Sequence, residues 1–114
     1  MTMSPTDLRT CIQNCWNARN ACQISLYNNG LDLGGAHASR DHVDIMTDCI
    51  EICQTAADFM VRRSPLHIAT CAACAEVCEA CAGSCDAVGD HDCAQACRTC
   101  AISCRAMADM HEPA

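Results

Sequence analysis

The chain has 114 residues, a formal net charge of −7 and 51% hydrophobic residues, with Cys and Ala supplying much of that apolar share. This length predicts one domain, 1–114, with a modest core. The acidic balance disfavours nucleic acid and anionic membranes as partners. The N-terminal segment lacks a basic region followed by an apolar run, which predicts no signal peptide, and no run of about 18 apolar residues predicts a membrane span. We therefore expect a cytoplasmic protein whose thiols stay reduced.

Start and stop signals predict four helices, at approximately 5–29, 39–63, 65–88 and 90–110. Ser4 and Pro5 form a cap-plus-proline start for the first helix, and the sequence Asn28-Asn29-Gly30 predicts its end. A loop follows, and Ser39 is the expected N-cap of the second helix.

The third helix is expected to begin at Ser64-Pro65 and to end near Gly89, and Asp90 is the expected N-cap of the fourth. Short connections between long helices favour antiparallel neighbours. The sequence therefore predicts an all-α fold, an antiparallel up-down-up-down four-helix bundle with a cysteine-lined core.

The most informative feature of the chain is its fourteen cysteines, which are spaced by three, four or seven residues within each predicted helix. They are Cys11, Cys15, Cys22, Cys49, Cys53, Cys71, Cys74, Cys78, Cys81, Cys85, Cys93, Cys97, Cys100 and Cys104. Residues at this spacing lie on one face of a helix, where a bundle normally places Leu and Ile. The pattern predicts rows of thiols that face inward and bind a soft metal ion.

The coordination chemistry of this pattern favours Cu(I). Soft thiolate ligands select Cu(I), whereas zinc prefers four ligands in a closed tetrahedron. Isolated thiolates are costly to bury, so one copper per cysteine, which leaves a neutral core, is expected rather than one per pair. Without metal, protonated thiols behave as small hydrophobic groups, which predicts a folded apoprotein.

Other soft donors extend the same faces and are candidate accessory ligands. They are His42, Met46, Met60, His67, Met107 and His111. In the predicted bundle, His42 and Met46 lie at one end, and the other four gather at the opposite end, which we expect to be the mouth through which copper enters.

Several alternatives remain open from the residues alone: an inert cysteine core, disulfide pairing, an iron–sulfur or thiol redox protein, and a zinc-buffering protein. The spacing from Cys71 to Cys81 differs from the ferredoxin pattern, which also ends in proline. Cysteines on one helix are poorly placed for a disulfide. No nucleophile–base pair or phosphate loop is evident, so no enzymatic activity is expected.

The cysteine pairs at 11/15, 49/53, 74/78, 81/85, 93/97 and 100/104, and the stretch CAACAEVCEACAGSC from Cys71 to Cys85, resemble the four-helix bundle copper storage proteins of the cytosolic, leaderless class. The resemblance implies Cu(I) storage by core thiolates, His and Met ligands near an open mouth, and a homotetramer. Copper chaperones or low-molecular-weight copper–thiol complexes are the implied partners. Ile12, Trp16 and Tyr27 are expected to form an outer apolar stripe that supports oligomerisation.

Overall fold

A computed structural model describes residues 5–110 of the chain. The main helices are α1 (Pro5–Ile24), α3 (Arg40–Val61), α4 (His67–Ala87) and α5 (His91–Asp109). Between α1 and α3 lie a π-helical segment η1 (Ser25–Gly30), the short helix α2 (Leu31–Leu33) and a 3₁₀ turn η2 (Gly35–Ala38). No strand is assigned in the described part of the chain.

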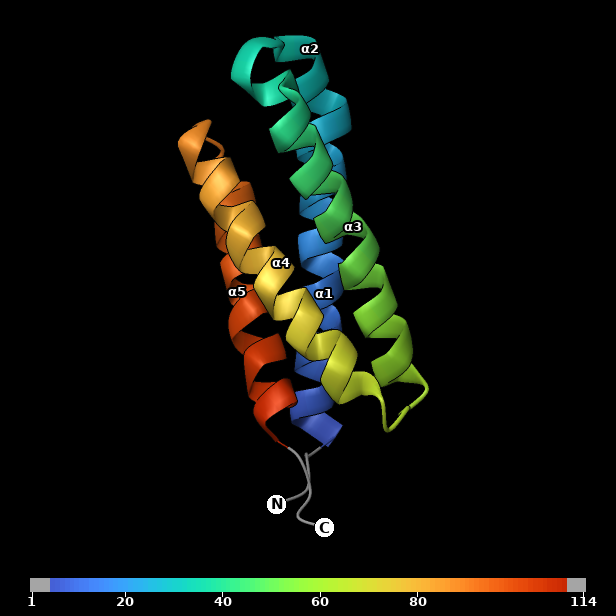
Figure 1. Cartoon of the computed structure of the whole chain (residues 1–114). Helices are drawn as coiled ribbons and strands as arrows, with labels where there is room; N and C mark the ends of the chain where they lie inside the picture. The colour runs from blue at the N-terminus through green and yellow to red at the C-terminus, as the bar shows by residue number, and fades with distance from the viewer. Residues whose placement is uncertain (1–4, 111–114) are drawn as a thin grey trace.

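The four long helices run alternately up and down, as Figure 1 shows. Helix α4 packs against α5 and α3, and α1 packs against α3 and α5, so the helices surround a common axis. The bundle measures 50 × 18 × 18 Å, which matches a single layer of helices around one core. The predicted all-α antiparallel four-helix bundle is confirmed.

The first helix continues beyond its predicted end at Asn28-Asn29-Gly30. Gly30 has a right-handed helical backbone with φ −61°, and a Cβ at this position would lie 3.2 Å from the Ser25 carbonyl oxygen. Helical structure stops only at Leu33, because Gly34 and Gly35 have positive φ values of 70° and 55°. The prediction was wrong here because a π-helical turn uses Gly30 for close packing rather than for reversing the backbone.

The predicted N-caps Ser39 and Asp90 are confirmed, whereas α4 begins later than predicted. The side chains of Ser39 and Asp90 accept hydrogen bonds from the backbone N–H groups of His42 and Cys93, each at 3.4 Å. Helix α4 begins at His67, after a turn in which the Ser64 carbonyl accepts from the His67 N–H at 3.1 Å. The cap-plus-proline signal therefore marks this turn rather than the first turn of α4.

Helix α4 is the one described helix that is long and apolar enough to cross a membrane, with a mean hydropathy of 1.3 over its best window. The expectation of no such segment rested on the length of uninterrupted apolar runs, whereas a mean hydropathy over a window tolerates polar residues such as Glu76 and Glu79 within it. A core helix of a water-soluble bundle meets the same criterion, and α4 packs directly on α3 and α5. Its buried residues are cysteines and alanines, and 39% of the apolar window lies inside the bundle.

The core is built almost entirely from small side chains. Its largest fully buried members are Leu26, Met46 and Met60, and the others are mostly cysteines and alanines. On the outer side of α1, Trp16 and Tyr27 are exposed as expected, but Ile12 is only 8% exposed and belongs to the core. Large apolar groups therefore close the ends and flanks of the bundle, and sulfur fills its axis.

Candidate metal centre

All fourteen cysteine side chains are buried, each at most 1% exposed, and all fourteen are free thiols. Each long helix contributes to this set because its cysteines repeat at helical spacing and so share its inward face. We call the fourteen Sγ atoms the sulfur column, since they follow the axis of the bundle. On α4 alone the column extends from Cys71 to Cys85, or about 21 Å at 1.5 Å per residue.

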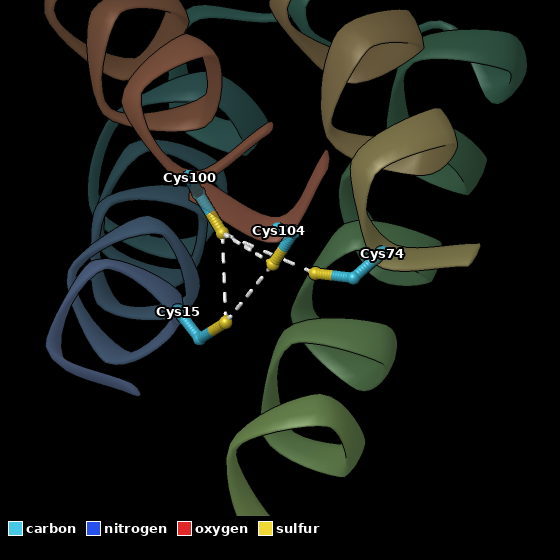
Figure 2. Close-up of side chains that lie close together, drawn as sticks. All are labelled: Cys15, Cys74, Cys100 and Cys104. Carbon is cyan, nitrogen blue, oxygen red and sulfur yellow. Dashed lines mark hydrogen bonds between the residues drawn. The ribbon is translucent and has the colours of Figure 1, made fainter. Parts of the chain in front are cut away.

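One group of the column joins three helices. The Sγ atom of Cys104 lies 3.5 Å from that of Cys15, and the Sγ atom of Cys100 lies 3.6 Å from that of Cys15. Cys74 approaches from α4, with its Sγ atom 3.9 Å from that of Cys100, and Figure 2 shows these side chains converging. The four sulfur atoms lie within 4.8 Å of one another, which is close enough to share an ion.

The groups interlock along the axis. Cys74 and Cys100 also belong to a second set of four with Cys53 and Cys78, whose Sγ atoms are 3.5 Å apart. At one end of the column, Cys104 forms a further group with two other sulfurs. These shared members link neighbouring groups without a break.

Cys49 connects this part of the column to the rest. Its Sγ atom lies 3.7 Å from that of Cys78 and 3.9 Å from that of Cys97. Cys97 lies in turn 3.6 Å from Cys22, and Cys22, Cys49, Cys81 and Cys97 form a third set of four. Sulfur–sulfur contacts of 3.6–3.9 Å thus join this third set to the rest of the column, and an ion can pass from group to group by ligand exchange.

The thiols of the column influence one another's ionisation. Cys100 has a lowered pKa, with its contact to Cys104 as the largest cause, while the same contact is the largest cause of a raised pKa at Cys104. Cys22 and Cys49 show the same opposite shifts. Their contact is the largest cause of a lowered pKa at Cys49 and of a raised pKa at Cys22. Burial raises all four because it disfavours the charged form. One thiolate is stabilised by neighbouring S–H groups, but complete ionisation of the column requires cations.

Two predicted accessory residues lie near the column at the end where α4 turns into α5. The Met46 Sδ atom is fully buried and lies 3.5 Å from the Sγ atoms of both Cys81 and Cys85. His42 is 5% exposed, and its Nδ1 atom is 2.7 Å from the Ser84 hydroxyl oxygen. The pKa of His42 is lowered, first by burial and then by repulsion from His37, which favours the neutral imidazole that binds metals.

The other predicted accessory residues belong to the opposite end. Met60 and Met107 are buried there. His67 donates from Nδ1 to the Ser64 carbonyl at 2.7 Å, and its buried Nε2 atom has no hydrogen-bond partner among the described residues. His111 lies outside the described residues.

Sequence reasoning missed two residues near the metal-binding groups. Asp90 was expected only as an N-cap, but its carboxylate also lies within 4.8 Å of the Sγ atoms of Cys85 and Cys93. His37 is not on any cysteine face, yet it lines a cavity of about 220 Å³ together with Asp90. Both lie in connecting segments, where helical periodicity gives no information, so only the folded arrangement reveals them.

The fold and the column define a class of protein: a four-helix bundle with a thiol-lined interior, suited to binding many soft metal ions. The family model for copper storage proteins matches residues 4–109. This chain belongs to the copper storage protein family, so the resemblance seen in the sequence is confirmed.

Solved structures agree with this assignment. A crystal structure of the Nmul_A1745 protein from Nitrosospira multiformis is 40% identical, with a TM-score of 0.89, covering 92% of this chain and 97% of that one. The Cu(I)-bound copper storage protein BsCsp3 is 35% identical, with a TM-score of 0.80 and coverage of 90% and 98%. The apo form of copper storage protein 3 from Bacillus subtilis is 36% identical, with a TM-score of 0.73 and coverage of 88% and 97%. No curated protein sequence gives a significant match.

Proposed function

We propose that this protein stores and sequesters Cu(I), with the fourteen cysteines of the sulfur column as ligands and without catalytic activity. The observation that carries this proposal is the interlocking of the sulfur groups, in which Cys74 and Cys100 each belong to two sets of four. An isolated zinc or iron–sulfur site needs a single set of ligands, whereas a continuous column suits many ions of low coordination number.

Charge sets the capacity. Each thiolate that bridges two Cu(I) ions allows one ion per cysteine, and the buried column is then neutral. At one ion per pair of cysteines, half of the thiolate charges would stay uncompensated in an interior that water does not reach. The capacity is therefore nearer to fourteen ions per chain than to seven, counted from the fourteen cysteines.

Neutral donors outside the cysteine set assist at the ends of the column. Met46 is the best supported, because its thioether already contacts two thiols. His42, Met60, His67, Met107 and His111 complete the set of accessory ligands. The buried Nε2 lone pair of His67 supports a mouth at the end formed by the start of α4, where a neutral imidazole is held by its Nδ1–H bond.

The protein acts in the cytoplasm as a homotetramer and exchanges copper with chaperones or small copper–thiol complexes, without binding nucleic acid or membranes. Family membership supports the location. The exposed Trp16 and Tyr27 on α1 support association between chains.

Titration of the fully reduced apoprotein against a competing chelator tests the proposal. We expect tight Cu(I) binding that saturates nearer to one ion per cysteine, and a colourless product, because a brown chromophore would indicate an iron–sulfur cluster. A parallel titration with Zn²⁺ provides the comparison. Saturation at three or four ions with a preference for zinc would reject copper storage in favour of zinc buffering.

A further inference from the structure

One end of the bundle carries a donor set that the all-cysteine interior lacks. At the turn between α4 and α5, the Asp90 carboxylate lies within 4.8 Å of the Sγ atoms of Cys85 and Cys93, which also lie within that distance of each other. The Asp90 side chain is held over the start of α5 because it accepts a hydrogen bond from the Cys93 N–H at 3.4 Å. Two thiols and one carboxylate therefore converge from two helices and their turn.

This end is also reachable from solvent. The cavity of about 220 Å³ that Asp90 lines is bounded on its other side by Ser25 and His37, from the segment between α1 and α3. The His37 imidazole is half-buried, and the central sulfur groups are fully buried. A hydrated ion can reach Asp90 through this cavity without entering the column.

The charges of these donors select the ion. Cys85 and Cys93, when ionised, and Asp90 carry three negative charges, of which a divalent ion leaves one and a monovalent ion leaves two. A carboxylate oxygen is also a poor ligand for Cu(I), whereas zinc is bound by Cys, His and Asp side chains together. A set of four thiolates around Zn²⁺ in the buried interior would retain two negative charges away from water, which is costly.

We propose that Cys85, Cys93 and Asp90, with His37 as the fourth donor, form a binding site for Zn²⁺ at this end of the copper-free protein. Binding displaces the two thiol protons to solvent, and the ion forms two bonds to sulfur, one to oxygen and one to nitrogen. The ligand atoms of Cys85, Cys93 and Asp90 need only small side-chain movements, since they lie within 4.8 Å of one another and sulfurs around tetrahedral zinc are roughly 3.8 Å apart at a Zn–S distance near 2.3 Å. The His37 imidazole is outside this group and approaches the ion across the cavity that it lines with Asp90. Because both cysteines also belong to the sulfur column, zinc and the outermost Cu(I) compete for them.

Asp90→Asn tests the site with little disturbance of the fold, because Asn is an equally good N-cap. Asp92→Asn is the matched control, since Asp92 is exposed in the first turn of the same helix and belongs to no group of candidate ligands in the described chain. The reduced apoproteins are titrated with Zn²⁺ against a chromophoric chelator, and with Co²⁺ to record the sulfur-to-metal charge-transfer bands. Far-UV circular dichroism verifies that the variants are helical.

We expect the tightest Zn²⁺ site to weaken by about tenfold or more in Asp90→Asn and to be unchanged in Asp92→Asn, as loss of a metal-site partner typically costs. His37→Gln is expected to weaken it as well, and the Co²⁺ spectrum of the wild type is expected to indicate two thiolates. Equal zinc affinity in the two aspartate variants, no tight zinc binding by the wild type, or a four-thiolate Co²⁺ spectrum would overturn the proposal. Cu(I) titration of the same proteins separates this outcome from a failure of copper storage, which would remove copper binding from the wild type too.

Discussion

The α4–α5 hairpin and helix α3 line the same axis with different chemistry. Helix α4 contributes five buried cysteines and α5 contributes four. Helix α3 contributes Cys49 and Cys53 only, and its other buried residues include Met46, Ala56 and Met60. All of these side chains are equally removed from solvent, so burial alone does not distinguish the two faces.

The difference separates what the fold needs from what the function needs. A bundle requires small or apolar side chains at helical spacing on each inner face, and Cys, Ala and Met meet that need equally well. Metal capacity requires sulfur. Helix α3 shows that the two needs can be met separately on a single helix, since its cysteines are confined to the middle of the helix. Changes to individual sulfurs should therefore alter copper binding far more than folding.

Removal of the shared sulfurs is expected to have the largest effect. In the double variant Cys74→Ala/Cys100→Ala, each of two interlocking groups of four loses two of its sulfurs. We expect the loss of Cu(I) ions to be about twice that in Cys22→Ala/Cys53→Ala, in which two groups of four lose one sulfur each. Chelator-competition titration measures both. An equal loss in the two variants would show that each cysteine binds copper independently.

Addition of sulfur to α3 tests the same comparison in the opposite direction. Ala56 is fully buried and lies seven residues after Cys49, on the same face of α3. Because Cys adds little volume to the core, Ala56→Cys is expected to raise the Cu(I) capacity by about one ion per chain, in line with soft-ligand selection. Ala94→Cys, at a buried position beside the cysteine row of α5, is the control without a gain. A higher Cu(I) capacity in both variants would show that any buried thiol binds copper, whether or not it faces the axis.

The two buried methionines of α3 are predicted to differ in copper binding. Met46→Leu removes a thioether that lies 3.5 Å from two thiols, whereas Met60→Leu removes a buried thioether near the opposite end of α3. Leu preserves most of the volume, so each variant is expected to lose less than about 1.5 kcal/mol of folding stability. Selenium-edge X-ray absorption of selenomethionine-labelled, copper-loaded protein should show selenium–copper scattering that Met46→Leu reduces more than Met60→Leu does. Scattering that survives in Met46→Leu and vanishes in Met60→Leu would reverse the assignment.

A smaller effect is expected in the pH dependence of stability. The pKa of His42 is lowered in the folded state from its usual 6.5, mainly by burial, so the unfolded chain binds more protons below that pH. The stability that the neutral His42 contributes is fully present above pH 6.5 and is lost as the pH falls through the folded pKa of His42. The Tm of the apoprotein should therefore fall more steeply on acidification in the wild type than in His42→Gln. Parallel curves for the two proteins would refute this role of His42.

The regular helices made most of this architecture predictable. The spacing of the fourteen cysteines gave their shared inner faces, and Ser39 and Asp90 were recognisable as N-caps. Non-helical and π-helical segments were not predictable in the same way. The course of the chain after Gly30 depends on local packing, and the meeting of Asp90 with His37 depends on how two connections face each other.

An anomalous difference map of the Cu(I)-loaded crystal, collected above and below the copper absorption edge, tests most directly whether the interior sulfurs bind the metal. We expect a row of copper peaks along the bundle axis, each between Sγ atoms that lie 3.5–3.9 Å apart. Copper found only on the outer surface, with an axis free of peaks, would contradict this expectation.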